Sequence, residues 1–321
     1  MTNLESRAPL SPGEGTALPR SSVLGEAIPF YNADRMIEPS TDCGNLAMAL
    51  TLRWQEQTEL IVDASELDPG ALAGFSAAEV AKRKLPVGNG ETEVGELFAL
   101  EGNLADSHLV LEGDLRKVRR IGQGMASGVL TVQGDVGTEA GSEMTGGTLT
   151  IQGNAGAWAG AEMRGGFLRI QGNAGDFVGA AYPGSRLGMK DGVILVAGDV
   201  GEDVGLVMRR GLIAIGGRSG GGLGRGMIAG SIFAFGAVGK RLGAGMKRGT
   251  LALFGGGESL HQGLLPTFAP SGRLRPPFLN LYLRRLQDWG VPVPQATFSG
   301  TIQRYNGDLV EGGQGEILAG S

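Results

Sequence analysis

The sequence contains little cysteine, histidine or aromatic side chain. Cys43 is the one cysteine and there are 2 histidines in 321 residues, which excludes a disulfide framework and a cysteine–histidine metal cluster. No apolar run approaches the roughly 20 residues of a membrane-spanning helix. The opening residues, MTNLESRAPLSPGEG, lack the apolar centre of a secretory signal. These absences predict a cytoplasmic protein that has no membrane segment.

Recognisable catalytic motifs are absent as well. His108 and His261 are far apart in the sequence, and neither a G-x-S-x-G nor an H-E-x-x-H pattern occurs. Lys240 follows a glycine but lacks the upstream glycine of a phosphate-binding loop, and GGRSGGGLGRG (216–226) does not fit G-x-G-x-x-G. No pair of carboxylates is marked by its spacing. We therefore predict that the chain has no catalytic residue, no metal site and no nucleic-acid site of its own.

Glycine, by contrast, is abundant and periodic. It makes up 59 of 321 residues, against a usual share of about 7%. A phrase of the form G-[DN]-[VA]-G-x-x-[AVL]-G-x-x-M-x-x-G recurs every 19 residues, except once after 26, where AAYPGSR (180–186) is inserted. Such a fixed period is typical of stacked repeats. The repeats begin at Val129, Thr148, Phe167, Val193, Leu212, Ser231 and Thr250.

Each repeat predicts one short strand followed by glycine corners. TLTIQ (148–152) and VILVA (193–197) are rich in the β-branched residues that favour strands. Gly141, Gly160 and Gly179 fall at one offset, where we expect positive φ angles that a Cβ would oppose. Stacking such turns pairs each repeat with the repeats before and after it. The fold class predicted is mainly β, a right-handed parallel β-helix built from 19-residue coils.

Two further side-chain types recur at one offset in successive repeats. The methionines can be interpreted as a metal or redox stripe, but stacked thioethers that fill the coil interior are the favoured interpretation. Asp135, Asn154, Asn173 and Asp199 follow the first glycine of their repeats and are interpreted as turn formers rather than as a carboxylate site. The methionines are Met125, Met144, Met163, Met189, Met208, Met227 and Met246.

The flanks of the repeats predict caps that cover the open ends. Residues 1–95 are expected to form an α/β cap with a disordered start of about 25 residues, residues 96–263 the β-helix, and residues 264–321 a C-terminal capping segment. In the first cap MALTLR (48–53) and ELIVD (59–63) are predicted strands, and SAAE (76–79) predicts a capping box before a short helix. In the last segment a helix is expected to end at Gly290. Its predicted apolar face is Phe278, Leu281, Tyr282, Leu286 and Trp289.

Basic residues follow the methionines. Residues 109–249 hold 16 lysines and arginines against 11 acidic residues, so this segment carries +5 while the whole chain carries −5. Like charges stacked one strand spacing apart repel one another, unless an anion neutralises them. An anionic group or an acidic protein surface is therefore one interpretation, and a solvated basic edge is the other. The candidate binding residues are Arg164, Lys190, Arg209, Arg210, Lys247 and Arg248.

The glycine triplets in six 19-residue units, within about residues 94–263, resemble the C subunits of formylmethanofuran dehydrogenase and of the bacterial formyltransferase/hydrolase complex. The tail QRYNGDLVEGGQGEIL (303–318) resembles the closing segment of the same subunits, and the same coil type occurs in the C-terminal domain of the glutamate synthase large subunit. The chain is too short for glutamate synthase. The C subunits of these complexes have no assigned catalytic residue, so the resemblance transfers none.

The resemblance implies a scaffold subunit, with an amidohydrolase-like subunit and a formyltransferase subunit as partners. The bacterial complex moves a formyl group from formyl-tetrahydromethanopterin to a methanofuran-type carrier and releases formate. The archaeal enzyme instead reduces carbon dioxide on molybdenum or tungsten. An excess of arginine over lysine, 22 to 6, favours the bacterial complex. A stand-alone β-helical carbohydrate-active enzyme and a hexapeptide-repeat acyltransferase stay open, although the 19-residue period disfavours both.

Overall fold

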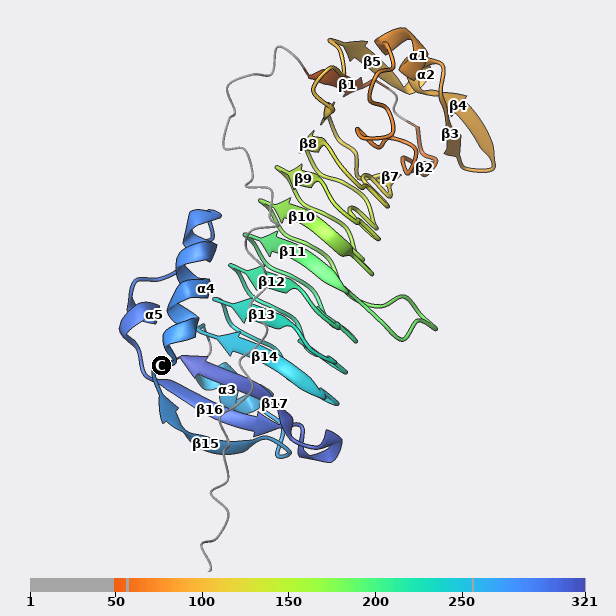
Figure 1. Cartoon of the computed structure of the whole chain (residues 1–321). Helices are drawn as coiled ribbons and strands as arrows, with labels where there is room; N and C mark the ends of the chain where they lie inside the picture. The colour runs from red at the N-terminus through yellow and green to blue at the C-terminus, as the bar shows by residue number, and fades with distance from the viewer. Residues whose placement is uncertain (1–48, 56–57, 256, 321) are drawn as a thin grey trace, which may run out of the picture. The chain divides into compact units, whose positions relative to one another are not determined.

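The computed structural model describes residues 49–55, 58–255 and 257–320. Every described residue belongs to one compact unit, Met36–Ser321. The predicted disorder of about the first 25 residues falls outside the described residues. Within them the fold is mainly β, with a large mixed sheet and few helices (Figure 1).

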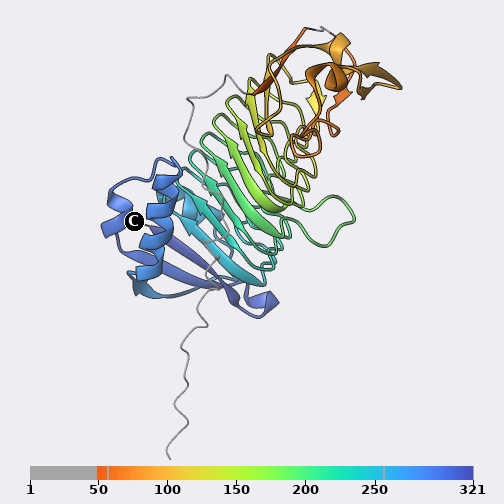
Figure 2. The ribbon, with the colours of Figure 1, turned by 45° about the horizontal axis from the view of Figure 1, so that its top comes forward.

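The main sheet has 13 strands in the order β15-β16-β17-β14-β13-β12-β11-β10-β9-β8-β6-β1-β5. From β6 to β14 every neighbouring pair is parallel and each repeat adds one strand, so the strands lie side by side in both views of the ribbon (Figures 1 and 2). Their bounds are β6 His108–Glu112, β8 Val129–Gln133, β9 Thr148–Ile151, β10 Arg164–Ile170, β11 Asp191–Val196, β12 Leu212–Ile215, β13 Ser231–Ala234 and β14 Arg248–Leu253.

The pairing register follows the sequence period. Thr148 of β9 lies opposite Val129 of β8 and Phe167 of β10, which are 19 residues before and after it. The 26-residue step is absorbed between β10 and β11, where Phe167 still pairs with Val193. A second ladder of single parallel bridges runs along another side of the repeats. It joins Leu115, Val136, Ala155, Ala174, Val200, Ser219 and Val238 in turn.

The interior is filled by one apolar cluster. Leu149 and Ile151 of β9 are 0% exposed and belong to it, as do the residues at the same positions of the other repeats. All seven methionines of the predicted column are also 0% exposed. The interior packing of the methionines is thereby confirmed. Gly141, Gly160 and Gly179 have φ of +65°, +63° and +66°, which confirms the predicted corners.

The Asp and Asn residues behave differently from the turn formers that the sequence predicted. Asp135 Oδ1 accepts the backbone N–H of Asn154, 2.7 Å away, and Asn154 Oδ1 accepts that of Asn173 at 2.8 Å. Asn173 and Asp199 continue the series into the following repeats. Each side chain therefore links its own repeat to the next one, because its short arm reaches a backbone donor one strand spacing away.

The N-terminal flank holds small elements. A 4-stranded sheet has the order β4-β3-β2-β7, and Ser76 and Glu79 form the predicted capping box. The strand expected at 59–63 is shorter than predicted, because β2 is only Val62–Asp63 and Leu60 and Ile61 are exposed. The bounds are β1 Leu50–Trp54, β3 Lys84–Val87, β4 Gly90–Glu93, β5 Phe98–Glu101, β7 Val118–Arg119, α1 Ala77–Ala81 and α2 Val94–Leu97.

The C-terminal flank closes the sheet and covers one outer face. The helix α4, Pro277–Asp288, lies beside the strands of the middle repeats (Figure 1). Its buried residues are Leu279, Leu283 and Leu286. The other elements are α3 Gly257–Gly263, β15 Ala269–Leu274, α5 Ala296–Ser299, β16 Ile302–Gly307, η3 Leu309–Glu311 and β17 Gln314–Gly320.

The face predicted for α4 was partly wrong. Leu281 is 59% exposed, while Leu279 and Leu283, which the prediction left out, are at 3% and 0%. Two apolar stripes of similar spacing exist on this helix, and the outer residues of β10–β14 select the leucine stripe. Phe278 and Tyr282 pack only at its border.

Candidate functional site

The basic residues predicted as a binding site stand in register. The backbone N–H groups of Arg164, Lys190 and Arg209 donate to the methionine carbonyls of the preceding repeats at 2.7–2.8 Å. Lys247 makes the same bond to Met227. These residues are therefore one strand spacing from the equivalent positions before and after them. We call this set the basic ladder; its members are Arg164, Lys190, Arg209, Arg210, Lys247 and Arg248.

Most of the basic ladder is exposed and free of acidic partners. Arg164 lies 3.5 Å from Glu143, and the Arg248 Nε–H donates to the side-chain oxygen of Gln314 at 2.8 Å. Within 49–55, 58–255 and 257–320, no carboxylate pairs with Lys190, Arg209, Arg210 or Lys247. Four cations therefore lie along this edge without an acidic partner among the described residues.

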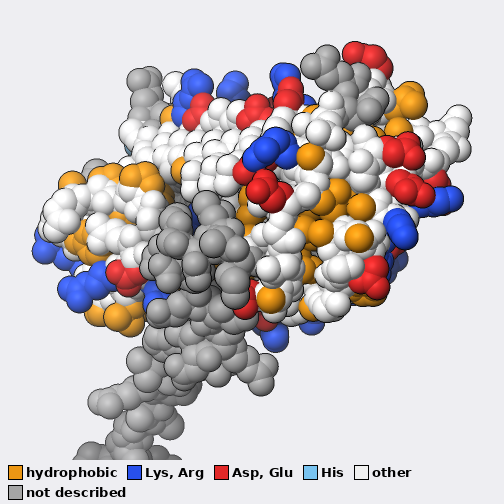
Figure 3. Space-filling view, turned by 90° about the horizontal axis from the view of Figure 1, so that it is seen from above, with side chains coloured by type: hydrophobic (Ala, Val, Ile, Leu, Met, Phe, Trp, Pro, Cys, Tyr) orange, Lys and Arg blue, Asp and Glu red, His pale blue; other side chains and the backbone are white. Residues whose placement is uncertain are grey.

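The basic ladder is interrupted. Ile228 and Ala229 occupy its positions between Arg209–Arg210 and Lys247–Arg248. Asp191 introduces an acid, since it pairs in register with Arg164. The repulsion predicted between stacked cations is thus reduced at both places. On the opposite side of the molecule, Figure 3 shows Lys and Arg side chains alternating with Asp and Glu side chains along the upper rim.

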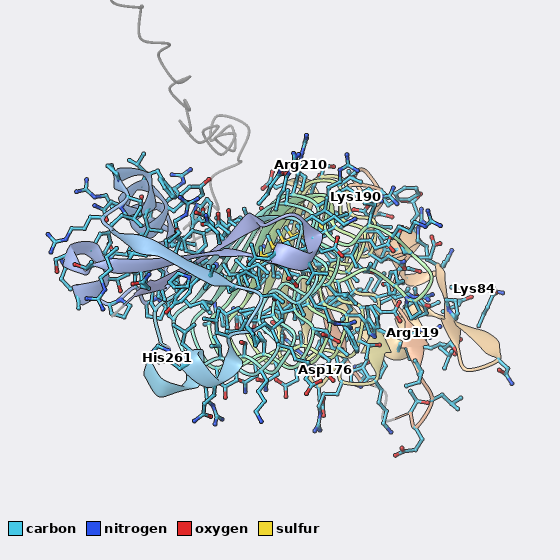
Figure 4. All side chains as sticks on the ribbon, turned by 90° about the horizontal axis from the view of Figure 1, so that it is seen from below. Lys84, Arg119, Asp176, Lys190, Arg210 and His261 are labelled. Atoms are coloured by element: carbon cyan, nitrogen blue, oxygen red, sulfur yellow. The ribbon has the colours of Figure 1, made fainter. Side chains whose placement is uncertain are left out.

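The cations still lie on one side of the repeats. In Figure 4 Lys190 and Arg210 lie on the side opposite Asp176 and His261. An exposed edge of this kind attracts anions over a Debye length of about 8 Å at physiological salt. Each exposed pair would contribute little by itself, about 0–1 kcal/mol. The geometry fits loose binding of an extended anionic partner better than a tight pocket.

A second cluster surrounds the insertion and was missed in the sequence. The Trp158 ring stacks on Phe177, with centroids 4.3 Å apart, and on Tyr182 at 5.2 Å. The Tyr182 hydroxyl donates to Glu139 Oε2 over 3.4 Å. The Arg120 Nε–H donates to the same oxygen at 2.8 Å. The Trp158 ring, which is itself stacked on Phe177, thus contacts Tyr182 within the insertion.

The backbone under this cluster is unusual. Trp158 and Phe177 have φ of +67° and +64°, a region that costs an L-residue of this size on the order of 1–3 kcal/mol. The residue at the same position of the other repeats also has a positive φ, and in one repeat that residue is a glycine. We call this the outer corner column; its members are Arg120, Glu139, Trp158, Phe177, Asp203, Gly222 and Arg241.

Burial and charge shift several pKa values here. Burial raises the pKa of Tyr182 to about 12. The hydrogen bond to Glu139, followed by the nearby charge of that group, raises the pKa of Arg120. Burial would raise the pKa of Asp63, but Ser65 donors, Arg120 and Arg119 outweigh it and the net shift is downward. These groups keep their ordinary charges at neutral pH, with Tyr182 neutral.

The sequence offered one signal for this cluster. Phe177 and Tyr182 lie in the repeat that carries the insertion, and Trp158 lies in the repeat before it. The segment that leaves the repeats differs from the insertion 180–186 assigned from the sequence. Ala180 and Ala181 stay buried, and Ala181 and Gly188 both donate to the next repeat, at Leu206 and Val207. The residues that leave the repeats are 182–187.

The histidines do not form a site with other titratable groups. His108 Nε2 lies 3.1 Å from Thr131 Oγ1, and burial lowers the pKa of this histidine. His261 lies in α3, at an exposed position. In the described part of the chain, no three His, Cys, Asp or Glu side chains are grouped so that they could hold a metal ion. No described helix is long and apolar enough to cross a membrane.

The glycine-rich segment 216–226 belongs to the regular series. Gly217 and Gly220 donate to Gly198 and Val200 of the preceding repeat. A Cβ at Gly220 would lie 2.8 Å from the Gly201 backbone, so the close approach of two repeats explains this glycine. This geometry gives no support to nucleotide binding by segment 216–226, a function that the sequence already argued against.

Several known proteins are similar to part of this chain, although no protein-family model matches it. The C subunit of tungsten-containing formylmethanofuran dehydrogenase 2 from Methanothermobacter thermautotrophicus is 34% identical over 92 residues, 27% of this chain. The C subunit of the formyltransferase/hydrolase complex from Methylorubrum extorquens is 36% identical over 87 residues, also 27% of this chain. The matched segments span 34% and 32% of these two relatives, about a third of their length.

A solved structure matches over far more of the chain. It comes from the crystal structure of the formyltransferase/hydrolase complex of Methylorubrum extorquens with methylofuran. The likeness has a TM-score of 0.77 and 34% identity, and covers 84% of this chain and 99% of the matched chain. The shared repeats and the extent of this match show that the chain belongs to the family of C subunits of formyltransferase/hydrolase and formylmethanofuran dehydrogenase complexes.

Proposed function

We propose that the chain is a non-catalytic scaffold subunit of a cytoplasmic formyltransferase/hydrolase complex. That complex would move a formyl group from formyl-tetrahydromethanopterin to a methanofuran-type carrier and release formate. The observation that carries the proposal is the likeness to a chain of the Methylorubrum extorquens complex, at 99% coverage of that chain. An amidohydrolase-like subunit and a formyltransferase subunit would supply the chemistry and bind the carrier and pterin.

We further infer that the repeats form a right-handed parallel β-helix. The support is the succession of parallel pairs from β6 to β14 and the second ladder of bridges on another side of the same repeats. Residues 1–95 and 264–321 would cap its two ends, around a β-helix of residues 96–263. A rod built this way is stiff, because each repeat donates backbone hydrogen bonds to its neighbours along the whole series.

The basic ladder is the surface that we propose for the carrier or for an acidic partner. Glutamyl tails, which the family resemblance implies for methanofuran-type carriers, carry several carboxylates. Exposed cations without acidic partners among the described residues, such as Arg209 and Arg210, would attract such a tail and release it readily. This favours a role in guiding a mobile chain between partner active sites.

The composition of the native complex tests the scaffold role. A tagged copy of this chain, expressed in its native host, is expected to co-purify with an amidohydrolase-like and a formyltransferase subunit, as identified by mass spectrometry. The complex should release formate from formyl-tetrahydromethanopterin, while the isolated chain should not. Recovery of the chain alone, or activity of the chain alone, would contradict the proposal.

Charge removal tests the basic ladder. Changing Arg164, Arg209, Arg210 and Arg248 to glutamine should leave folding intact, lower formyl transfer severalfold at low salt and weaken its salt dependence. A matched control removes the same charge elsewhere, at exposed positions Arg53, Lys84, Arg116 and Arg218. Equal transfer rates for wild type and the ladder variant across a salt series would leave the ladder as a solvated edge.

A second candidate function is the C subunit of a molybdenum- or tungsten-containing formylmethanofuran dehydrogenase. The similarity to such subunits from Methanothermobacter supports it. Metal analysis of the native complex separates the two, because molybdenum or tungsten in stoichiometric amount would favour the dehydrogenase. A stand-alone carbohydrate-active enzyme is the weakest candidate, and polysaccharide cleavage by the isolated chain would revive it.

A further inference from the structure

The inserted loop 182–187 contains hydrogen bonds of its own. The Ser185 N–H donates to the Tyr182 carbonyl at 2.9 Å, which closes a four-residue turn. Pro183 and Gly184 occupy its middle positions and Gly184 has φ of +86°, as a type II turn requires. Ser185 also contacts Leu187, with its hydroxyl 3.4 Å from the Leu187 carbonyl oxygen. A four-residue turn therefore orders a loop that projects beyond the neighbouring repeats (Figures 1 and 2).

The base of the loop is held by two earlier repeats. Tyr182 leaves from the repeat of Phe167, but its ring stacks on Trp158 one repeat earlier and its hydroxyl reaches Glu139 two repeats earlier. Its backbone N–H donates to Glu162 Oε1 at 3.3 Å. These contacts orient the turn relative to the rigid repeats.

The left-handed backbone at Trp158 and Phe177 belongs to the repeat, because every member of the outer corner column has a positive φ. The corner does not require an aromatic side chain, since Gly222 occupies the same column two repeats after Phe177. Large aromatic side chains are nevertheless present at Trp158, which stacks on Tyr182, and at Phe177, which stacks on Trp158. The aromatic side chains therefore contribute to holding the loop rather than to forming the corner.

The exposed part of the loop has a simple chemistry. Pro183, Gly184 and Arg186 are exposed, and Arg186 is the one charged residue of 182–187. The chain rejoins the repeats at Gly188, two residues before Lys190 of the basic ladder. The loop thus presents an uncharged turn and a cation at the border of a cationic edge, which complements an acidic surface.

We propose that the loop 182–187 is a preorganised docking loop, which inserts into an acidic recess of another subunit and pairs Arg186 with a carboxylate there. The inference rests on the proposed function, because it assumes a multisubunit complex. Preorganisation matters because a loop that is already ordered loses little conformational freedom on binding. Insertions in repeat proteins commonly project from the binding face.

The first test removes the support without touching the loop. Trp158→Gly deletes the stacked ring and suits the left-handed backbone, so the chain should stay folded while the loop loosens. Trypsin cleavage after Arg186, followed by mass spectrometry on the full chain, should accelerate about fivefold or more. The matched control is Arg241→Gly, in the same column but two repeats beyond that of Asp203. An unchanged cleavage rate in Trp158→Gly overturns the supporting role.

The second test addresses the partner in the native complex. Arg186→Glu should weaken recovery of the other subunits about tenfold and Arg186→Gln should weaken it less, whereas Arg218→Glu, an exposed cation outside the loop, should not. A photocrosslinker at Ser185 should label an Asp- or Glu-rich segment of another subunit. Labelling of a second copy of this chain, or of a basic segment, overturns the proposal.

The two proposals fail in different ways. If the wild-type chain recovers no other subunit, the scaffold function is wrong and the docking loop is wrong with it. If wild type, Trp158→Gly and Arg186→Glu recover the other subunits equally, the complex exists and only the docking loop is overturned.

Discussion

The third residue of strands β8, β9, β12 and β13 faces outward, and it differs between β8–β9 and β12–β13. On β8 and β9 this residue is a threonine, Thr131 or Thr150, which stays partly exposed. On β12–β14 the equivalent residues are apolar, such as Ala214 and Phe233, and they are buried against α4. The inward residues are the same type throughout. The repeats therefore stack with or without a covering helix, and α4 packs where the outward residues are apolar.

The largest expected effect comes from the interior that both regions share. In Gly160→Val the left-handed φ of +63° becomes strained and a Cβ would lie 2.5 Å from Ile194 Cδ1. The free energy of unfolding should fall by about 3 kcal/mol or more. Thermal melting measures this, with Gly124→Asn as a control, because Gly124 is left-handed but has open space around it. A shift of the midpoint below about 2 °C would contradict the shared-corner argument.

The next effect separates the covered region from the rest. Leu283→Ala should lower the free energy of unfolding by about 2–5 kcal/mol, because Leu283 is 0% exposed between α4 and the sheet. Leu281→Ala on the same helix should change it by less than about 0.5 kcal/mol, since Leu281 is 59% exposed. Denaturant unfolding compares the two. Equal losses would show that Leu281 is buried as well as Leu283.

A smaller effect is expected at the third residue of the strand, which differs between β12 and β9. Ala214→Thr places a hydroxyl in the contact with α4 and should cost about 1–3 kcal/mol. Thr150→Val at the equivalent position of β9 should be close to neutral, because that residue is partly exposed. Chemical unfolding of both variants measures the difference. A clearly stabilised Thr150→Val would mean that apolar residues also cover the outer face of β9.

The smallest effect concerns two tyrosines, Tyr182 at the inserted loop and Tyr282 on α4. Burial raises the pKa of Tyr182 to about 12, and burial also raises the pKa of Tyr282. A raised pKa favours the neutral phenol in the folded state. Its stabilisation is complete below the ordinary tyrosine pKa of about 10 and is lost as pH rises through the folded value.

Ultraviolet titration of phenolate absorbance measures this. Tyr182→Phe and Tyr282→Phe should each remove one late-titrating group. Because ionisation of Tyr182 would loosen the loop, we expect trypsin cleavage after Arg186 to accelerate at alkaline pH in wild type, and only Tyr182→Phe should remove that acceleration. If the loop opens with unchanged pH dependence in Tyr182→Phe, the phenol does not hold it. Wild type at neutral pH is the reference for both variants.

Much of the fold could be predicted from the residues. The 19-residue period located the strands, the methionine positions identified interior side chains, and the glycine offset identified left-handed corners. The capping box at Ser76 and the helix ending before Gly290 were also correct. These features depend on local geometry repeated many times, so one residue type at one offset is a sufficient signal.

The candidate site was only partly predictable. The basic ladder and its register could be derived from the period, but Asp191 opposite Arg164 could not, because that pairing depends on how the 26-residue repeat is accommodated. The cluster of Trp158, Phe177 and Tyr182 joins residues of different repeats with Glu139. A ring contact across repeats has no fixed sequence spacing and was therefore missed.

The sequence by itself determined the repeat, its interior and its corners. In every repeat glycine forms the left-handed corner, methionine fills the interior and β-branched residues form the strand, so each signal recurs with the same period. Only the tertiary structure decided which stripe of α4 is buried, which backbone N–H groups the Asp and Asn side chains accept, and how Tyr182 is held. Each of these outcomes depends on which atoms the folded neighbours bring within contact distance.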